Sequence, residues 1–108
     1  MEVFPKDLLY YETADGRVPA RDWLDAKEGS EEYGKIMTRL ERVQQGSFGD
    51  HGPVGEGVSE LRIDFGPGYR VYYGRDGVDF VILLVVGSKK TQQVDIDTAK
   101  GYWEDYNA

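Results

Sequence analysis

A nearly unbroken apolar run, Val78 to Val86, constrains the fold of this chain more than any other feature. A short apolar run without alternation is typical of a strand that is covered on both faces. Its longest purely apolar part, Phe80 to Val86, has seven residues, which is far too few to span a membrane. The sequence therefore predicts a central strand of a sheet.

Two shorter runs precede it and alternate between apolar and polar residues, as strands with one buried face do. They occupy residues 59–65 and 69–73, and Gly66-Pro67-Gly68 separates them. Asp76-Gly77 then gives a hairpin signal before the central strand. We expect a three-stranded antiparallel meander with five cross-strand pairs: Phe65 with Tyr69, Asp64 with Arg70, Arg62 with Tyr72, Tyr73 with Phe80 and Val71 with Ile82.

The first half of the chain is predicted to form one short strand and two helices. Leu8 to Tyr11 forms the strand, and Pro19 suits the first turn of a short helix that ends at Gly29. Ser30 can cap a second helix. That helix carries an apolar stripe at helical spacing, formed by Tyr33, Ile36, Met37, Leu40 and Val43.

The remaining segments are a loop and a last helix. Gly46 to Gly57 contains five glycines and one proline, and we interpret it as a loop. Asp95 or Asp97 can cap the last helix. The order β-α-α-β-β-β-α predicts a single α+β domain over residues 1–108, with a small antiparallel meander sheet and an N-terminal helical hairpin packed on one face.

Composition excludes several classes of site. The chain has no cysteine, which excludes disulfides, thiol nucleophiles and zinc–cysteine sites. It has one histidine, His51, which argues against a multi-histidine metal site. The first residues lack a basic region followed by an apolar core, so we expect no signal peptide and a cytoplasmic protein.

The candidate chemistry is cationic. Arg62 and Arg70 lie on neighbouring predicted strands and point to the same non-core face, and Lys89 and Lys90 follow directly after the central strand. Guanidinium groups there can grip a phosphate, and a lysine can stabilise charge or move a proton. The alternative is a solvated sheet face on which Arg70 pairs with Asp64 and Arg62 with Glu60.

Other signals are weaker. His51 could act as a general base, although a lone loop histidine commonly has no role. Asp95-Ile96-Asp97 lacks the later ligands of a calcium loop, so we expect no metal and no cofactor. Tyr102 and Tyr106 fit the core spacing of the last helix, and one edge of either ring could serve as a stacking platform for a base.

Three stretches resemble one protein family, and the resemblance covers essentially the whole chain. They are Gly57-Val58-Ser59-Glu60-Leu61-Arg62-Ile63, Gly66-Pro67-Gly68-Tyr69-Arg70-Val71-Tyr72-Tyr73, and the run from Ile82 to Gln92. Trp23-Leu24, Arg39-Leu40 and the loop from Gly46 to Asp50 agree as well. The chain resembles the RelE/ParE toxin superfamily, and within it the HigB-like addiction module killer proteins.

This resemblance implies a RelE-like fold and the toxin of a type II toxin–antitoxin system. RelE- and HigB-like members are metal-independent endonucleases that cleave mRNA on the ribosome. The implied catalytic residues are Arg62, Arg70, Lys89 and Lys90; the implied substrate-binding candidates are Tyr72, Gln92, Tyr106 and His51. The implied partner is a cognate antitoxin, expected to be a helix-turn-helix protein.

Two other functions fit the same resemblance. One is a ParE-like inhibitor that binds DNA gyrase and cleaves nothing. The other is an inactive relative that acts with its antitoxin as a corepressor. The cluster of Arg62, Arg70 and the two lysines discriminates the endonuclease from the gyrase inhibitor, because a protein that only binds does not need to arrange these groups.

The charge distribution leads to one further expectation. The net charge is −7, but residues 58–94 carry 5 basic and 4 acidic side chains, whereas residues 1–57 carry 7 and 12. Phosphate repulsion would slow the association of a uniformly acidic protein with RNA. We therefore expect a two-sided molecule, with all four basic candidates on one positive patch and the acidic residues of the first two helices on the far side.

Overall fold

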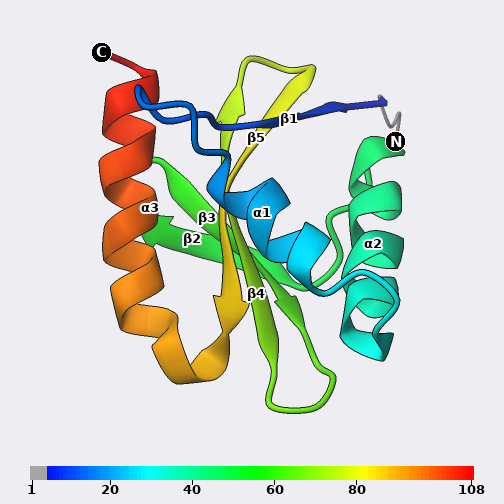
Figure 1. Ribbon diagram of the computed structural model, residues 1–108. Coiled ribbons are helices and arrows are strands. Elements are labelled where there is room, and N and C mark those ends of the chain that lie inside the picture. The colour runs from blue at the N-terminus through cyan, green and yellow to red at the C-terminus, as the bar shows by residue number, and fades with distance from the viewer. Residues whose placement is uncertain (1–4) are drawn as a thin grey trace.

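The computed structural model describes residues 5–108, so residues 1–4, part of the segment in which no signal peptide is expected, lie outside it. A five-stranded sheet with the order β1-β5-β4-β3-β2 forms the centre (Figure 1). Its strands are β1 (Asp7–Tyr10), β2 (His51–Gly55), β3 (Val58–Ile63), β4 (Tyr69–Asp76) and β5 (Phe80–Ser88). The helices are α1 (Pro19–Ala26), α2 (Glu31–Gln44), the 3₁₀ turn η1 (Lys89–Thr91) and α3 (Gln92–Tyr106).

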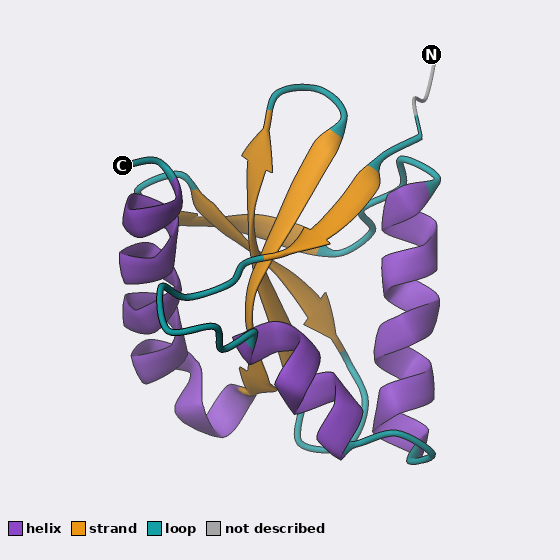
Figure 2. Ribbon diagram, turned by 45° about the horizontal axis from the view of Figure 1, so that its top comes forward, coloured by secondary structure: helices purple, strands orange, loops and turns teal. Residues whose placement is uncertain are grey.

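The predicted α+β class is confirmed, and β5 is the central strand that its composition predicts. It pairs in parallel with β1 and antiparallel with β4. Figure 2 shows helices on both faces of the sheet. Within residues 5–108, no helix combines the length and the apolar character that crossing a bilayer requires.

The sheet has one strand more than the sequence predicts. His51–Gly55, expected to be part of a loop, forms the edge strand β2 and pairs antiparallel with β3. Pro53 cannot donate a backbone hydrogen bond, but an edge strand can accommodate it. The glycine-rich composition gives no strand pattern in the sequence. The pairing is also irregular, with a register shift between Pro53 and Gly55.

The predicted pairing between β3 and β4 is wrong by two residues. Ile63, not Phe65, lies opposite Tyr69, and Arg62 lies opposite Arg70. The turn is longer than the predicted Gly-Pro-Gly, since Asp64 and Phe65 also belong to it and the Gly68 N–H donates to the Phe65 carbonyl at 2.9 Å. A shift of two keeps each side chain on its predicted face.

The predicted pairing between β4 and β5 is also wrong. Asp76 lies opposite Phe80, so a three-residue turn joins the strands, and a bulge follows between Tyr72 and Tyr73. Tyr73 therefore faces Leu83, and Val71 faces Val86 in place of Ile82. An extra residue of this kind is not visible in the alternation of apolar and polar residues along the sequence.

The face under α1 and α2 is a continuous apolar core, as the helical hairpin predicts. The Ser30 hydroxyl caps α2 by accepting from the Tyr33 N–H at 3.1 Å. Five side chains on this helical layer are at most 2% exposed, and they pack against buried residues of the strands. These helical residues are Ala20, Leu24, Ile36, Leu40 and Val43.

The opposite face is covered by α3, which begins at Gln92, before both predicted aspartate caps, Asp95 and Asp97. Its Ala99 is fully buried against an apolar group that includes Tyr72, Ile82 and Leu84. Trp103 lies directly over Gly74, where any Cβ would clash with the indole ring. This apolar contact occupies only part of the face, and the candidate site lies in the rest.

Candidate functional site

A cleft of about 370 Å³ opens where the β3–β4 turn meets the junction of β5 and η1. These two segments lie at the same end of the molecule (Figure 1), and the Lys89 N–H donates to the Gly68 carbonyl at 2.8 Å. We call this space the first cleft. Its lining residues are Asp50, Arg62, Asp64, Gly66, Pro67, Gly68, Arg70 and Lys89.

Glu60 does not line the first cleft but contacts both of its arginines. Its side chain is only 5% exposed, and one carboxylate oxygen accepts from Arg62 Nε at 2.9 Å. The other oxygen accepts from Gln92 Nε2 at 3.1 Å and lies 3.9 Å from Arg70 Nε. A buried carboxylate is stable only with such partners. Glu60 therefore fixes both arginines and the start of α3 relative to one another.

Arg62 is held on two sides. Its Nη1 donates to an oxygen of Asp50 at 3.0 Å, in addition to the bond from Nε to Glu60. Hydrogen bonds to Asp50 and then Glu60 raise the pKa of Arg62 above its ordinary value. Gly52 makes room for the guanidinium, because a Cβ there would stand 2.7 Å from Nη2. About a third of the Arg62 side chain, 36%, remains exposed.

Arg70 is the more buried arginine, with 12% of its side chain exposed. Its Nη1 donates to the Tyr69 carbonyl at 3.0 Å, and its buried Nε has no hydrogen-bond partner in the described residues. Lys89 lies across the cleft and is exposed. Within residues 5–108, neither Lys89 nor Asp64 makes an ion pair, so the predicted alternative of an Arg70–Asp64 pair is wrong and the Arg62–Glu60 pair is present.

Arg39 of α2 connects the loop to the sheet behind this cleft. Its guanidinium donates to the carbonyls of Arg62 at 2.5 Å, Phe48 at 2.8 Å and Asp50 at 3.0 Å. Burial lowers the pKa of Arg39 from its ordinary value. One side chain thus holds the backbones that carry Asp50 and Arg62, a role that helical periodicity does not reveal.

Contrary to the prediction, Tyr72 does not reach the first cleft. It lies opposite Glu60 rather than Arg62, and α3 seals it completely from solvent. Burial, followed by the charges of Glu60 and Asp95, raises the pKa of its hydroxyl. That hydroxyl has no hydrogen-bond partner in the described residues. Tyr72 is thus a core residue that cannot touch a substrate in this conformation.

Three other candidates lie elsewhere. His51 pairs with Leu61, whose side chain is in the core under α1 and α2, so it faces away from Arg62. Its Nδ1 is bonded to the Gly49 carbonyl at 2.7 Å. Tyr106 ends α3, the helix that Gln92 begins, and donates to Asp76 at 2.7 Å. Lys90 lines a separate cleft.

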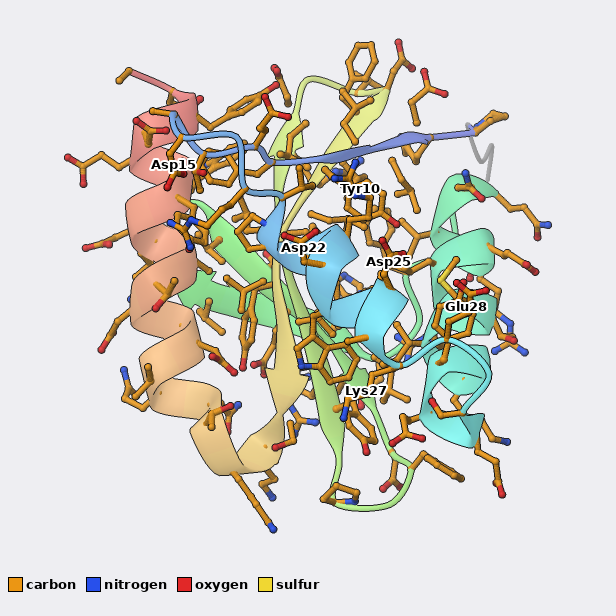
Figure 3. All side chains as sticks on the ribbon, viewed as in Figure 1. Tyr10, Asp15, Asp22, Asp25, Lys27 and Glu28 are labelled. Atoms are coloured by element: carbon orange, nitrogen blue, oxygen red, sulfur yellow. The ribbon has the colours of Figure 1, made fainter. Side chains whose placement is uncertain are left out.

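The predicted two-sided charge distribution is correct only in part. Asp22 and Asp25 lie along α1 in Figure 3, Glu28 lies beyond the end of that helix, and α1 covers the face opposite to Arg62 and Arg70. The positive patch, however, is not a set of four free cations. Lys90 is outside it, and Asp50, Asp64 and Glu60 stand among the other three.

The first cleft can hold a phosphate group. Arg62, Arg70 and Lys89 present cationic groups to one space, and Gln92 joins them through Glu60. Planar guanidinium groups match phosphate oxygens, and a lysine adds a compact charge. Within residues 5–108, no three His, Asp or Glu side chains gather as they would around a metal ion.

Comparison with known proteins places these residues within a described sequence family. Residues 22–101 match the family described as phage derived protein Gp49-like (DUF891), and this range includes the whole lining of the first cleft. An uncharacterized protein of Haemophilus influenzae (strain ATCC 51907 / DSM 11121 / KW20 / Rd) is 46% identical over 78 residues. The aligned part covers 72% of this chain and 79% of that protein.

Proposed function

The chain belongs to the Gp49-like family of phage-derived proteins, and we propose that it is a RelE/HigB-like toxin that cleaves mRNA on the ribosome. The family is associated with toxin–antitoxin addiction modules. An antitoxin is therefore the expected partner, and we propose a helix-turn-helix protein in that role. An mRNA target also implies a cytoplasmic site of action.

The observation that carries this proposal is the convergence of Arg62, Arg70 and Lys89 on one cleft. In the proposed reaction the 2′-oxygen of a ribose attacks the adjacent phosphorus and loses its proton. The bond from phosphorus to the 5′-oxygen breaks, and that oxygen takes up a proton. The products are a 2′,3′-cyclic phosphate and a 5′-hydroxyl, and no other reactant is consumed.

Each side chain has a proposed part in this reaction. Arg62 and Arg70 stabilise the negative charge that grows on the phosphate oxygens, and Glu60 keeps their positions fixed. Lys89, which is exposed and makes no ion pair within residues 5–108, stabilises charge or carries a proton. Gln92 supports Glu60 from α3.

The ion pairs of Arg62 favour a second candidate, an inactive relative that acts with its antitoxin as a corepressor. Arg62 already binds two carboxylates, so a phosphate would have to compete with Asp50. In this case the first cleft would be a structural network, and the protein would bind its antitoxin without cleaving RNA.

Inducible expression without the antitoxin separates these candidates. The toxin proposal predicts growth arrest, mRNA cut within translated regions, and rescue by co-expression of the adjacent small reading frame. Normal growth with intact transcripts supports the corepressor. Growth arrest with intact transcripts and accumulated gyrase–DNA breaks supports a ParE-like activity instead.

A further inference from the structure

A second cleft of about 400 Å³ lies on the other side of the β3–β4 turn. Pro67 lines both clefts, and the neighbours Lys89 and Lys90 line one each. β1 pairs with the first residues of β5, Phe80–Leu83. The second cleft opens beside the last residues of the same strand, Val86, Gly87 and Ser88. Its lining residues are Trp23, Lys27, Pro67, Tyr69, Val86, Gly87, Ser88, Lys90, Thr91 and Asp95.

One wall of the second cleft is aromatic. Trp23 is half-buried and meets the ring of Tyr69 at 6.0 Å between centroids, with the planes at 66°. Lys27 lies at the lower end of α1 in Figure 3, with its Nζ 5.5 Å from the centre of the Trp23 ring. Lys27 therefore lies over one face of a partly exposed indole, and a nucleobase that stacks on that face would displace the lysine and leave its charge for the phosphate.

The charges of the second cleft favour an anionic ligand. Lys27 and Lys90 make no ion pair within residues 5–108. The one carboxylate of the lining, Asp95, accepts a hydrogen bond from the Thr91 hydroxyl at 2.6 Å. The lining thus carries two cations against one carboxylate that is already engaged.

We propose that the second cleft is a nucleotide subsite of the same RNA strand, next to the phosphate held in the first cleft. A base stacks on Trp23 while Lys27 and Lys90 contact its phosphate. This inference rests on the proposed nuclease function. A single strand that crosses the turn at Pro67 meets Lys89 on one side and Lys90 on the other, so that one lysine stands on each side of the turn.

The direct test uses an RNA hexanucleotide with 2′-O-methyl groups, which blocks the attacking hydroxyl, at low salt. Binding to the wild-type protein is expected to change tryptophan fluorescence. The Trp23→Phe variant should lose most of that signal and bind a few-fold more weakly, because phenylalanine keeps only part of the stacking surface. Trp103→Phe is the matched control, because Trp103 lies over Gly74 at the other end of α3.

Charge variants give a readout that does not depend on the tryptophan. Lys27→Ala and Lys90→Ala should each reduce the slope of log affinity against log salt by about 0.7. Lys100→Ala removes the same charge outside both clefts and should leave the slope unchanged. Wild-type slopes in both cleft variants would overturn the subsite.

The subsite and the nuclease fail in different ways. Cleavage of RNA with an unchanged KM in the Trp23→Phe and Lys90→Ala variants would overturn the subsite and leave the nuclease intact. Oligonucleotide binding that depends on Trp23 and Lys90, without any cleavage by the wild-type protein, would support the subsite and overturn the nuclease. Lys90 is exposed, so its variant is expected to fold even if Trp23→Phe does not.

Discussion

The two faces of the sheet are built from the same strands but differ in what lies under their helices. Beneath α1 and α2 the contact is mainly apolar, with the Arg39 guanidinium donating to backbone carbonyls of the sheet and of the loop before it. Beneath α3 the contact is apolar around Ala99. At the start of the helix the contact is polar and consists of a buried carboxylate, Glu60, with two arginines and a glutamine. One face therefore supplies stability, and half of the other is available for chemistry.

The difference shows how a small chain can hold charged groups in fixed positions. A network of buried charges adds little net stability and is costly when incomplete. The apolar face and the Ala99 region supply the burial that allows such a network.

The largest effect is expected on the apolar face. Ile36→Ala removes a fully buried side chain and should lower the free energy of unfolding by about 3–4 kcal/mol. Urea denaturation measures this directly. A loss below about 1 kcal/mol would mean that this face is not the main source of stability.

Arg70→Ala should have its main effect on function. Loss of one group that stabilises transition-state charge commonly reduces the rate about a hundredfold or more, and the fold should remain. RNA cleavage and denaturation are measured on the same preparation. Arg75→Ala is the control, because Arg75 lies on the same strand but outside both clefts, against Phe48. An Arg70→Ala protein with full activity would place the site elsewhere.

Glu60→Gln tests whether the network activates or blocks the arginines. It keeps the shape of the side chain but removes the charge that fixes Arg62 and Arg70. We expect roughly tenfold lower cleavage and a loss of about 2 kcal/mol in stability, since hydrogen bonds to charged groups weaken. Tighter RNA binding without cleavage would support the corepressor, in which the ion pair with Glu60 keeps Arg62 from binding phosphate.

The smallest effect is expected at Tyr72. Its buried hydroxyl has no partner within residues 5–108, so Tyr72→Phe should change stability at neutral pH by less than about 0.5 kcal/mol. Because burial raises the pKa of Tyr72 above its ordinary 10.0, the unfolded chain loses this proton first as the pH rises. Wild-type stability should therefore fall above pH 10, and the phenylalanine variant should fall less steeply. Identical alkaline profiles would contradict this account.

Much of the fold could be predicted from local patterns. The apolar run identifies β5 as central, and Pro19 and Ser30 mark the starts of two helices. Register could not be predicted in the same way. The bulge at Tyr72 and the long turn after Ile63 depend on backbone geometry that the alternation of residue types does not encode.

The site could be predicted only in part, for a related reason. Counting by two places Arg62 and Arg70 on one face, and the structure brings Lys89 and Gln92 to them. The sequence pattern places Glu60 on a solvated face, because Gln92 of α3, which contacts it, is 32 residues away in the sequence. The glycine-rich composition places His51 in a loop, whereas its position in β2 directs it away from the arginines.

The most direct test of the central claim is the chemistry of the RNA ends. Purified protein, programmed ribosomes and mRNA are combined in EDTA-free buffer, and the ends of the cleaved strand are identified. The proposed reaction predicts 2′,3′-cyclic phosphate and 5′-hydroxyl ends in the presence of the wild-type protein and of Arg75→Ala, and about a hundredfold fewer with Arg70→Ala. Intact mRNA, or ends of this kind at equal rates with Arg70→Ala, would contradict the assignment of the first cleft as a catalytic phosphate site.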